Sequence, residues 1–406
     1  MKEKLFGHWR VISVAVFIFI ITFFLGFKTG EYKVSQVALV SGVDHKSGPK
    51  NVDFEAFWKA WNVINEKYVP TTSSTTPTNQ EKVWGAIQGL AASTGDPYTV
   101  FFPPVEAKAF EEQISGSFEG VGMEVDIKDG VLTVIAPLKD TPAYKAGIKA
   151  GDKIIGIDKK TTQGLDTGEA IKRIKGPKGS TVLFTIVRGG SSEPIEISVV
   201  RDVIVVPAMK IEIIDDVFAI HMYSFSAQSA DEFRKALRQF VESGKHKLIL
   251  DLRGNPGGYL EAAVDMASWF LPSGKLIVAE QSKNLTFSQE YRSRGYNIFN
   301  DKLKFAILID GGSASASEIL AGALSEHGKA FLVGKKTYGK GSVQELVEIT
   351  PETSLKVTIA KWLTPNGHSI SKAGIDPQID IDLDVEKFRT TGEDTQLKRA
   401  IEELDK

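Results

Sequence analysis

Residues 305–324 read FAILIDGGSASASEILAGAL and decide the fold of the second half of the chain. An apolar run is followed by two glycines, by three serines that alternate with alanines, and by a run of strong helix formers. This order is typical of a strand, a tight turn and a helix, which together present a serine at the tip of the turn. Ser313, Ser315 and Ser317 are therefore candidate nucleophiles.

The same plan of strand, glycine-rich turn and helix occurs in KLILDLRGNPGGYLEAAVDMASWFL, residues 247–271. A strand at 215–225 and a helix at 229–244, capped by Ser229 or Asp231, precede it, and AFLVGKK at 330–336 adds a strand. This alternation predicts a mostly parallel sheet flanked by helices. Because ligands bind beyond the carboxyl ends of such strands, the two glycine-rich turns are expected to converge on one site.

Short strands dominate residues 115–202, where Lys128-Asp129-Gly130 predicts a hairpin. Within this region, TPAYKAGIKAGDKIIGIDKK resembles the stretch SPAxxAGLxxGDxIxxVNG of PDZ domains almost position for position. In that family a glycine-rich loop before a strand binds the terminal carboxylate of a peptide. The resemblance implies that the loop lies in EGVGMEV and that its carboxylate nest consists of Gly120, Val121, Gly122 and Met123.

A serine hydroxyl needs a base before it can attack a carbonyl group. The chain has six histidines, and none stands in a recognisable triad context, although triad partners meet only in the fold and spacing excludes none of them. Lys340, between two glycines and just after the strand predicted at 330–336, is the alternative base. From these residues alone, a Ser-His-Asp triad and a Ser-Lys pair both remain open.

Larger motifs resemble the C-terminal processing peptidases, also called tail-specific proteases. GGSASASEILAGAL followed by VGKKTYGKGSVQ carries the resemblance, which runs from about residue 52 to the end of the chain. It also includes GDPYTVFFPP at 95–104, DLRGNPGG at 251–258, TPNGHSI at 364–370 and GIDPQIDI at 374–381. The resemblance implies an α/β multidomain protein, with a crotonase-like (ClpP/crotonase-type) protease core and an inserted β-rich PDZ domain.

Residue by residue, the resemblance implies that Ser315 is the nucleophile, Lys340 the general base and Gln344 a supporting third residue. The backbone N–H groups of Ala316 and Gly257 would form the oxyanion hole. Neither a metal nor a cofactor is expected. Lys340 must be neutral to accept a proton, so its pKa must lie roughly three units below the free value of about 10.4. We therefore expect a desolvated Lys340 without a carboxylate partner, to which Gln344 offers a neutral hydrogen-bond acceptor.

The chain begins with Lys2, Lys4 and Arg10, followed by the uncharged run VISVAVFIFIITFFLGF at residues 11–27. This run approaches the roughly 20 apolar residues of a transmembrane helix. Bulky residues stand where a cleavable signal peptide needs small ones, which favours an uncleaved signal anchor over that alternative. The positive-inside rule then leaves residues 1–10 in the cytoplasm and the catalytic part on the periplasmic or extracellular face.

We predict that the anchor is followed by a linker at 28–50, a helical region at 51–113 and the PDZ domain at 114–202. The protease core follows at 203–386, with a C-terminal helix at 387–406. The net charge of −2 argues against nucleic-acid binding, and the absence of cysteine excludes disulfides and thiol catalysis. The expected partners are the membrane and protein or peptide substrates with free C-terminal tails. A homodimer is also predicted, through apolar helix faces at Val52–Gly95 and Asp394–Leu404.

Three rival functions are weaker. A membrane-tethered PDZ adaptor without activity predicts the loss of Ser315, Lys340 or Gln344, which are all present. A PDZ-bearing Ser-His-Asp protease places its catalytic domain before the PDZ domain, whereas this chain has the reverse order. An acyl-CoA enzyme on the related core fold would not need an anchor or a PDZ domain.

Overall fold

The computed structural model describes residues 52–71, 76–189, 193–282 and 287–406. These fall into two units, residues 1–77 and residues 78–406, which are described separately. The predicted anchor at 11–27, with its flanks at 1–10 and 28–50, lies outside the described residues. Within the described ranges, no helix has the length and apolar character needed to span a membrane.

The first unit contains helix α2 (Glu55–Lys67), which agrees with the helical spacing of its aromatic residues. Aromatic residues at such spacing usually face a core, but those of α2 do not. No residue of α2 is buried, and the rings contact one another along the helix, as Phe57 and Trp58 do at 5.0 Å. Among the described residues 52–71 and 76–77, no second helix or strand covers them.

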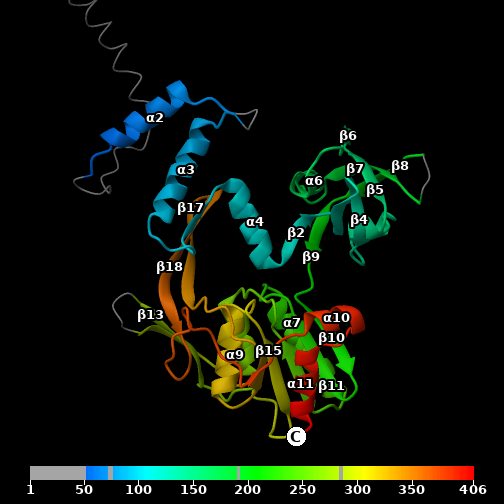
Figure 1. The fold of residues 1–406 in the computed structure, drawn as a ribbon, viewed down its shortest axis with the longest axis vertical. Coiled ribbons are helices and arrows are strands. Elements are labelled where there is room, and N and C mark those ends of the chain that lie inside the picture. The colour runs from blue at the N-terminus through cyan, green and yellow to red at the C-terminus, as the bar shows by residue number, and fades with distance from the viewer. Residues whose placement is uncertain (1–51, 72–75, 190–192, 283–286) are drawn as a thin grey trace, which may run out of the picture. The chain divides into compact units, whose positions relative to one another are not determined.

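The centre of the second unit is a six-stranded sheet in the order β10-β11-β12-β15-β16-β19 (Figure 1). Only β10 runs antiparallel to its neighbour, so the prediction of a mostly parallel sheet is confirmed. The strands are β10 (Met209–Ile214), β11 (Val217–Met222), β12 (Lys247–Asp251), β15 (Lys304–Ile309), β16 (Phe331–Gly334) and β19 (Ile379–Asp380).

Strand β15 shows why the sheet is buried on both faces. Phe305 and Ile307 belong to one apolar cluster, and the alternate residues Ala306 and Leu308 belong to another. The first cluster also contains residues of α7 (Ser229–Glu242), α8 (Leu260–Ser268) and α9 (Ala316–Glu326). The second contains residues of α11 (Thr395–Leu404). Because successive side chains point to opposite faces, a continuous apolar run is what a strand between two helical layers requires.

Two details of the helices differ from the sequence analysis. Neither Ser229 nor Asp231 caps α7, whose N-cap residue is Gln228, because the Ser229 hydroxyl donates to the Ser226 carbonyl at 2.7 Å. Helix α11 buries Ala400 and Leu404 against its own core. This packing removes that face from the surface on which the predicted homodimer relied.

A second, antiparallel sheet was not predicted. Strand β18 pairs with β1, β13 and β17, and β13 pairs with β14. Its strands are β1 (Val100–Phe102), β13 (Leu276–Ser282), β14 (Phe287–Arg292), β17 (Ser342–Thr350) and β18 (Thr353–Leu363). Strand β1 lies between α3 (Asn79–Ala92) and α4 (Pro104–Ser115), within the region at 51–113 that was predicted to be helical. The short helix α10 (Val385–Thr391) precedes α11.

Residues 117–205 begin and end with a two-stranded ladder of β2 (Ser117–Gly120) and β9 (Asp202–Val205). Between them lies a six-stranded sheet with its own apolar core, which includes Val134, Ile154 and Phe184. The hairpin predicted at Lys128-Asp129-Gly130 joins the first two strands of this sheet. Its elements are β3 (Met123–Lys128), β4 (Val131–Pro137), α5 (Pro142–Lys145), β5 (Lys153–Ile157), β6 (Lys160–Thr161), α6 (Thr167–Ile174), β7 (Thr181–Val187) and β8 (Ile195–Val200).

Candidate active site

Ser315 lies at the N-cap of α9, in the turn that follows β15. Its φ of 55° is in the left-handed region, which costs a residue with a Cβ of the order of 1 kcal/mol and places the side chain at the tip of the turn. The other two serines are fully buried. Ser313 donates to the Leu252 carbonyl at 2.7 Å, and Ser317 donates to the Asn255 carbonyl at 3.0 Å. The hydroxyl groups of Ser313 and Ser317 therefore stabilise the turn through hydrogen bonds to the neighbouring backbone. Of the three serines, only Ser315 is partly exposed.

The glycine-rich turn after β12 lies against this serine, as the convergence of the two turns predicted. Gly257 has a φ of 96°, and a Cβ there would stand 2.6 Å from the Ala314 carbonyl oxygen and 2.8 Å from the Ser315 Cβ. The Gly257 N–H donates to the Asn255 Oδ1 at 2.9 Å. Among the described residues, no hydrogen bond is recorded for the N–H of Ala316, at the start of α9.

Lys340 lies in the loop between β16 and β17, next to the serine turn. Gly341 follows with a φ of 32°, and a Cβ there would collide with the backbone of Ser371. Only a glycine fits so close an approach without moving the loop. This contact fixes the backbone from which the Lys340 side chain extends.

One buried carboxylate joins the serine turn to the lysine loop. Glu318 of α9 is fully buried, and its Oε2 accepts from the N–H of Ser315 at 2.9 Å and from the N–H of Lys340 at 3.2 Å. Its Oε1 accepts from the Thr337 hydroxyl and the Gly339 N–H, both at 2.7 Å. A buried charge needs such partners, and here they come from both sides of the site. Sequence reasoning missed this role, although an acid three residues after an N-cap serine is the spacing of a capping box.

The Lys340 amine lies 5.5 Å from the centre of the Tyr98 ring, within the range of a cation–π contact. Burial lowers the pKa of Lys340, and the positive charge of Lys356 lowers it further, while the negative charge of Glu318 opposes both. Burial also raises the pKa of Tyr98 to about 12, so this phenol is neutral at physiological pH. The direction of the lysine shift is the one that general-base chemistry requires. Tyr98 lies in the motif GDPYTVFFPP, but the sequence analysis assigned no role to it or to Lys356.

The side chains of Ser315, Lys340 and Gln344 do not form a hydrogen-bonded chain in this conformation. Across the described part of the chain, no hydrogen bond is recorded between the Lys340 amine and the Ser315 hydroxyl. The Gln344 amide donates instead to the hydroxyl of Ser342 at 2.6 Å and to its carbonyl at 3.0 Å. The three residues stand in neighbouring segments, but the amine points to Tyr98.

Three of the described histidines contact residues other than Ser315. His221 lies 3.2 Å from Asp251 and 3.6 Å from Glu212, on a strand whose residues Val217 and Ala219 face the α11 side of the sheet. His327 bonds to the Leu276 carbonyl, and His368 to Glu326. His8 and His45 lie outside the described residues, and no histidine within them bonds to Ser315. The Ser-His-Asp alternative therefore has no geometric support.

The carbonyl groups of the predicted peptide loop are bonded to the rest of the domain. The carbonyl of Val121 accepts from the N–H of Ala143 at 2.8 Å, and the carbonyl of Gly122 accepts from the N–H of Leu138 at 3.0 Å. Within the described residues, the N–H groups of Val121 and Gly122 have no recorded partner. Gly120 ends β2 and Met123 begins β3, so the loop connects two strands.

Comparisons with known proteins agree with this architecture. The sequence pattern of Peptidase family S41 matches residues 216–381, and the pattern of the PDZ domain matches residues 133–188. The carboxy-terminal processing protease CtpA of Bacillus subtilis is 35% identical over 384 residues, which are 94% of this chain and 78% of CtpA. CtpB of the same organism is 34% identical over 367 residues, which are 88% of this chain and 74% of CtpB. The crystal structure of an S41 protease from Bacteroides fragilis matches this chain with a TM-score of 0.52 and 17% sequence identity. The match covers 85% of this chain and 96% of the other chain, and it supports the fold alone.

Proposed function

Because this chain belongs to peptidase family S41 and is a carboxy-terminal processing serine protease with a PDZ domain, we propose that Ser315 is its nucleophile and Lys340 its general base. The observation that carries the proposal is the shared acceptor Glu318, whose Oε2 takes a hydrogen bond from the backbone N–H of each residue. That buried oxygen holds the two backbones side by side.

The catalytic step begins when the Lys340 side chain turns from Tyr98 towards the Ser315 hydroxyl. The neutral amine takes the hydroxyl proton, and Oγ forms a bond to the substrate carbonyl carbon. The peptide C–N bond then breaks, and the ammonium returns the proton to the leaving nitrogen. In the second half, water attacks the acyl ester and loses a proton to Lys340. The Oγ–C bond breaks and Ser315 recovers its proton.

The oxyanion that forms in each half of the reaction needs preorganised donors. We assign this role to the N–H of Ala316, which stands at the positive end of α9, and to the N–H of Gly257. The assignment of the Ala316 N–H is supported because, within the described residues, this group has no hydrogen-bond acceptor. The Gly257 N–H must turn away from, or be shared with, Asn255 Oδ1, with which it bonds at 2.9 Å in this conformation.

Gln344 is proposed to support the base once the amine reaches Ser315. Its amide oxygen can accept from the amine without adding negative charge, which would raise the lysine pKa. It stands on β17, only two residues after Ser342, whose hydroxyl and carbonyl hold its amide nitrogen. The catalytic conformation would therefore require the Gln344 side chain to move together with that of Lys340.

Substrate selection is assigned to the PDZ domain, which would bind a free C-terminal tail. The tail carboxylate would take the unbonded N–H groups of Val121 and Gly122, with Gly120 and Met123 completing the loop, and the tail would add as a strand beside β3. We further propose that tail binding couples to the approach of Lys340 to Ser315. If deletion of residues 115–201 left tail-dependent cleavage unchanged, the coupling would be wrong.

The remaining proposals concern the setting of the enzyme. The run at residues 11–27 supports a single membrane anchor with the catalytic part outside the cytoplasm. The parallel sheet with its helical layers supports a crotonase-like core. A homodimer would use the exposed apolar residues of α2, such as Phe57 and Ile64, since the apolar face of α11 is buried against its own core.

The decisive experiment assays the full chain and three variants, Ser315→Ala, Lys340→Met and Gln344→Ala, on an unstructured protein with an apolar C-terminus. We expect no cleavage from the first two variants and reduced cleavage from the third. The same substrate with two aspartates added at its C-terminus should be cleaved more slowly by the unaltered chain. Proteolysis by a folded Lys340→Met variant at the unaltered rate would contradict the assignment of the base.

A further inference from the structure

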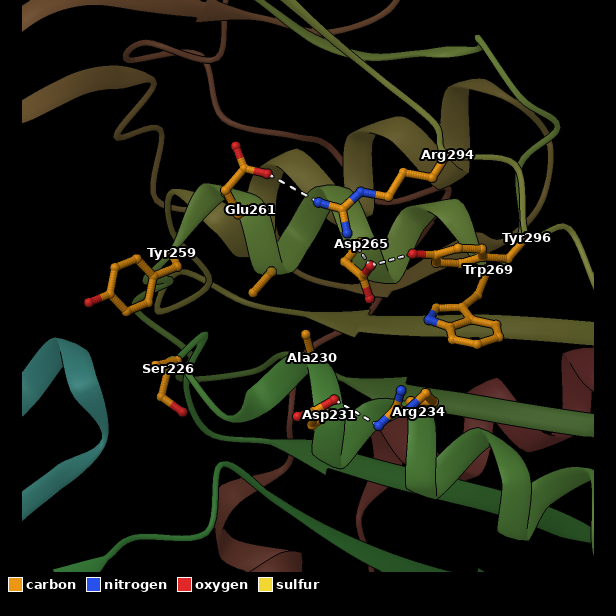
Figure 2. A pocket seen from close by; sticks show the side chains of 12 residues that line it. Ser226, Ala230, Asp231, Arg234, Tyr259, Glu261, Asp265, Trp269, Arg294 and Tyr296 are labelled. Atoms are coloured by element: carbon orange, nitrogen blue, oxygen red, sulfur yellow. Dashed lines mark hydrogen bonds and ion pairs between the residues drawn. The ribbon is translucent and has the colours of Figure 1, made fainter.

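A cavity of about 600 Å³ opens between α7 and α8, within the core of the second unit (Figure 2). Three small side chains, Ala227, Ala230 and Ala262, are among its lining residues and leave the space between the helices unfilled. In Figure 2, Tyr259 stands at one end, and Trp269 and Tyr296 stand at the other. The volume lies within the range of about 300–1,000 Å³ that is usual for ligand pockets.

The walls of the cavity favour an apolar occupant. The rings of Trp269 and Tyr296 pack together at a tilt of 44°, with their centres 4.5 Å apart, and form the aromatic wall at one end. Burial of a bulky apolar side chain against these alanine and aromatic side chains is favourable, because both apolar surfaces are then removed from water. The cavity is larger than a single side chain, so a short segment of extended polypeptide fits it better than an isolated residue.

The charged side chains at the rim disfavour an acidic occupant. Arg234 pairs with Asp231 at 2.9 Å, and Arg294 pairs with Asp265 at 2.6 Å and with Glu261 at 3.4 Å. Both arginines are therefore engaged, and the lining carries one carboxylate more than it has guanidinium groups. Figure 2 shows the pair of Asp231 and Arg234 on α7, and Arg294 reaching Glu261 on α8.

Among the described residues, two buried polar groups of side chains that line the cavity have no hydrogen-bond partner. Ser226 is 2% exposed and its hydroxyl is unbonded, and the indole N–H of Trp269 is likewise unbonded. A buried polar group without a partner costs about 1–3 kcal/mol. A peptide carbonyl could accept from either group only if that side chain rotated towards the cavity, whereas a purely apolar ligand could satisfy neither.

The cavity begins at the glycine-rich turn beside the proposed nucleophile. Tyr259 is two residues after Gly257, and its N–H donates to the Phe225 carbonyl at 2.7 Å. Phe225 in turn donates its N–H to the Gly257 carbonyl at 2.9 Å and directly precedes Ser226. Both residues at this end of the cavity are therefore tied to the turn that contacts Ser315.

We propose that this cavity is a substrate subsite that accepts a bulky apolar side chain close to the scissile bond, together with the adjoining main chain. The inference rests on the proposed function, because the cavity selects residues for a reaction at Ser315. It is distinct from tail recognition by the PDZ domain, since its lining comes entirely from the core. Selection would thus occur twice, at the tail and at the cleavage point.

The test uses the full chain and internally quenched peptides in which one residue, Phe, Ala or Glu, is scanned along both sides of the scissile bond. At one position, we expect Phe to exceed Ala in kcat/KM by about tenfold or more, because burial of its side chain favours the complex by that order. Glu should be poorest there. Ala230→Phe should abolish the preference by filling the cavity, and Ala227→Phe should weaken it from an exposed position that cannot overpack the core.

Val241→Phe is the matched control, because it adds the same ring to α7 at a residue that is 58% exposed and outside the cavity. It should keep the preference. If active Ala230→Phe and Ala227→Phe enzymes keep it too, or if the unaltered chain shows no such position, the subsite is refuted. If Ala230→Phe does not fold, Ala227→Phe decides alone. Cleavage by Ser315→Ala would instead refute the proposed function.

Discussion

Replacing Glu318 with glutamine separates two effects of this carboxylate, one on stability and one on the proton affinity of the base. Its two oxygens accept four hydrogen bonds, from Ser315, Lys340, Gly339 and Thr337. Glutamine keeps the shape but offers one oxygen and one NH2 group. The favoured orientation puts the NH2 group beside Thr337, because that hydroxyl can accept as well as donate.

In this orientation the Ser315 and Lys340 N–H groups keep an oxygen acceptor, while the Gly339 N–H faces another donor. One buried N–H left without a partner costs about 1–3 kcal/mol. The retained bonds also weaken, since their acceptor is no longer charged, but burying a neutral amide is cheaper than burying a carboxylate. We therefore expect Glu318→Gln to lower the free energy of unfolding by about 1–3 kcal/mol.

The charge change acts on catalysis in a defined direction. The negative charge of Glu318 raises the pKa of Lys340, against burial and Lys356, which lower it. Without that charge, the ammonium form is less favoured and the pKa of Lys340 falls. The acid limb of kcat/KM against pH, which reports the loss of the neutral base, should then shift to lower pH. The variant would be less stable, yet keep its activity in more acidic solution.

Glu326→Gln is the matched control, because Glu326 lies on the same helix and accepts from the Thr364 hydroxyl at 2.7 Å and the Asn366 N–H at 2.8 Å. It should lose stability without moving the acid limb. Urea unfolding and pH profiles of all three proteins make the comparison. An acid limb in Glu318→Gln that stays in place, or shifts to higher pH, would refute the electrostatic reasoning.

Three further substitutions test other parts of the site. Lys356→Met removes a charge that lowers the pKa of the proposed base, so the acid limb of kcat/KM should shift to higher pH, whereas Lys356→Arg should leave it in place. Gly341→Ala should abolish turnover in a folded protein, judged by circular dichroism, because its Cβ would collide with the facing backbone; Gly311→Ala, with open space around it, should not. Gly122→Ala should weaken binding of an apolar-tailed peptide in fluorescence anisotropy, since its Cβ would stand 2.5 Å from a threonine, while Gly130→Ala shares the positive φ without the clash and should bind normally.

Local patterns in the sequence predicted much of the fold. The run FAILI and the helix formers after Ser315 predicted β15 and α9, because strand and helix each have their own periodicity. The second sheet was missed because its pairings join distant residues, as Val100 pairs with Lys356. No local pattern encodes such a partner, and the VFF of β1 is too short to be recognised as a strand by alternation.

The site was predictable where a motif carries chemistry and unpredictable where geometry decides. Ser315 and Lys340 are found from their motifs, and their backbones meet at one oxygen of Glu318. The Lys340 amine, in contrast, contacts the ring of Tyr98, which is more than 200 residues away in sequence. The buried Glu318 was overlooked because acids in a first helical turn are ordinarily solvated partners of the helix dipole.

The pairing of β1 with β18 has a practical consequence for anyone who wishes to shorten this protein. Residues Val100–Phe102 shield a stretch of β18 whose hydrogen-bonding groups would otherwise be open to solvent. Exposed strand edges readily recruit other chains. A fragment that begins after residue 102 would therefore be prone to self-association, whereas one that begins at Thr78, the capping residue of α3, retains both the helix and the strand.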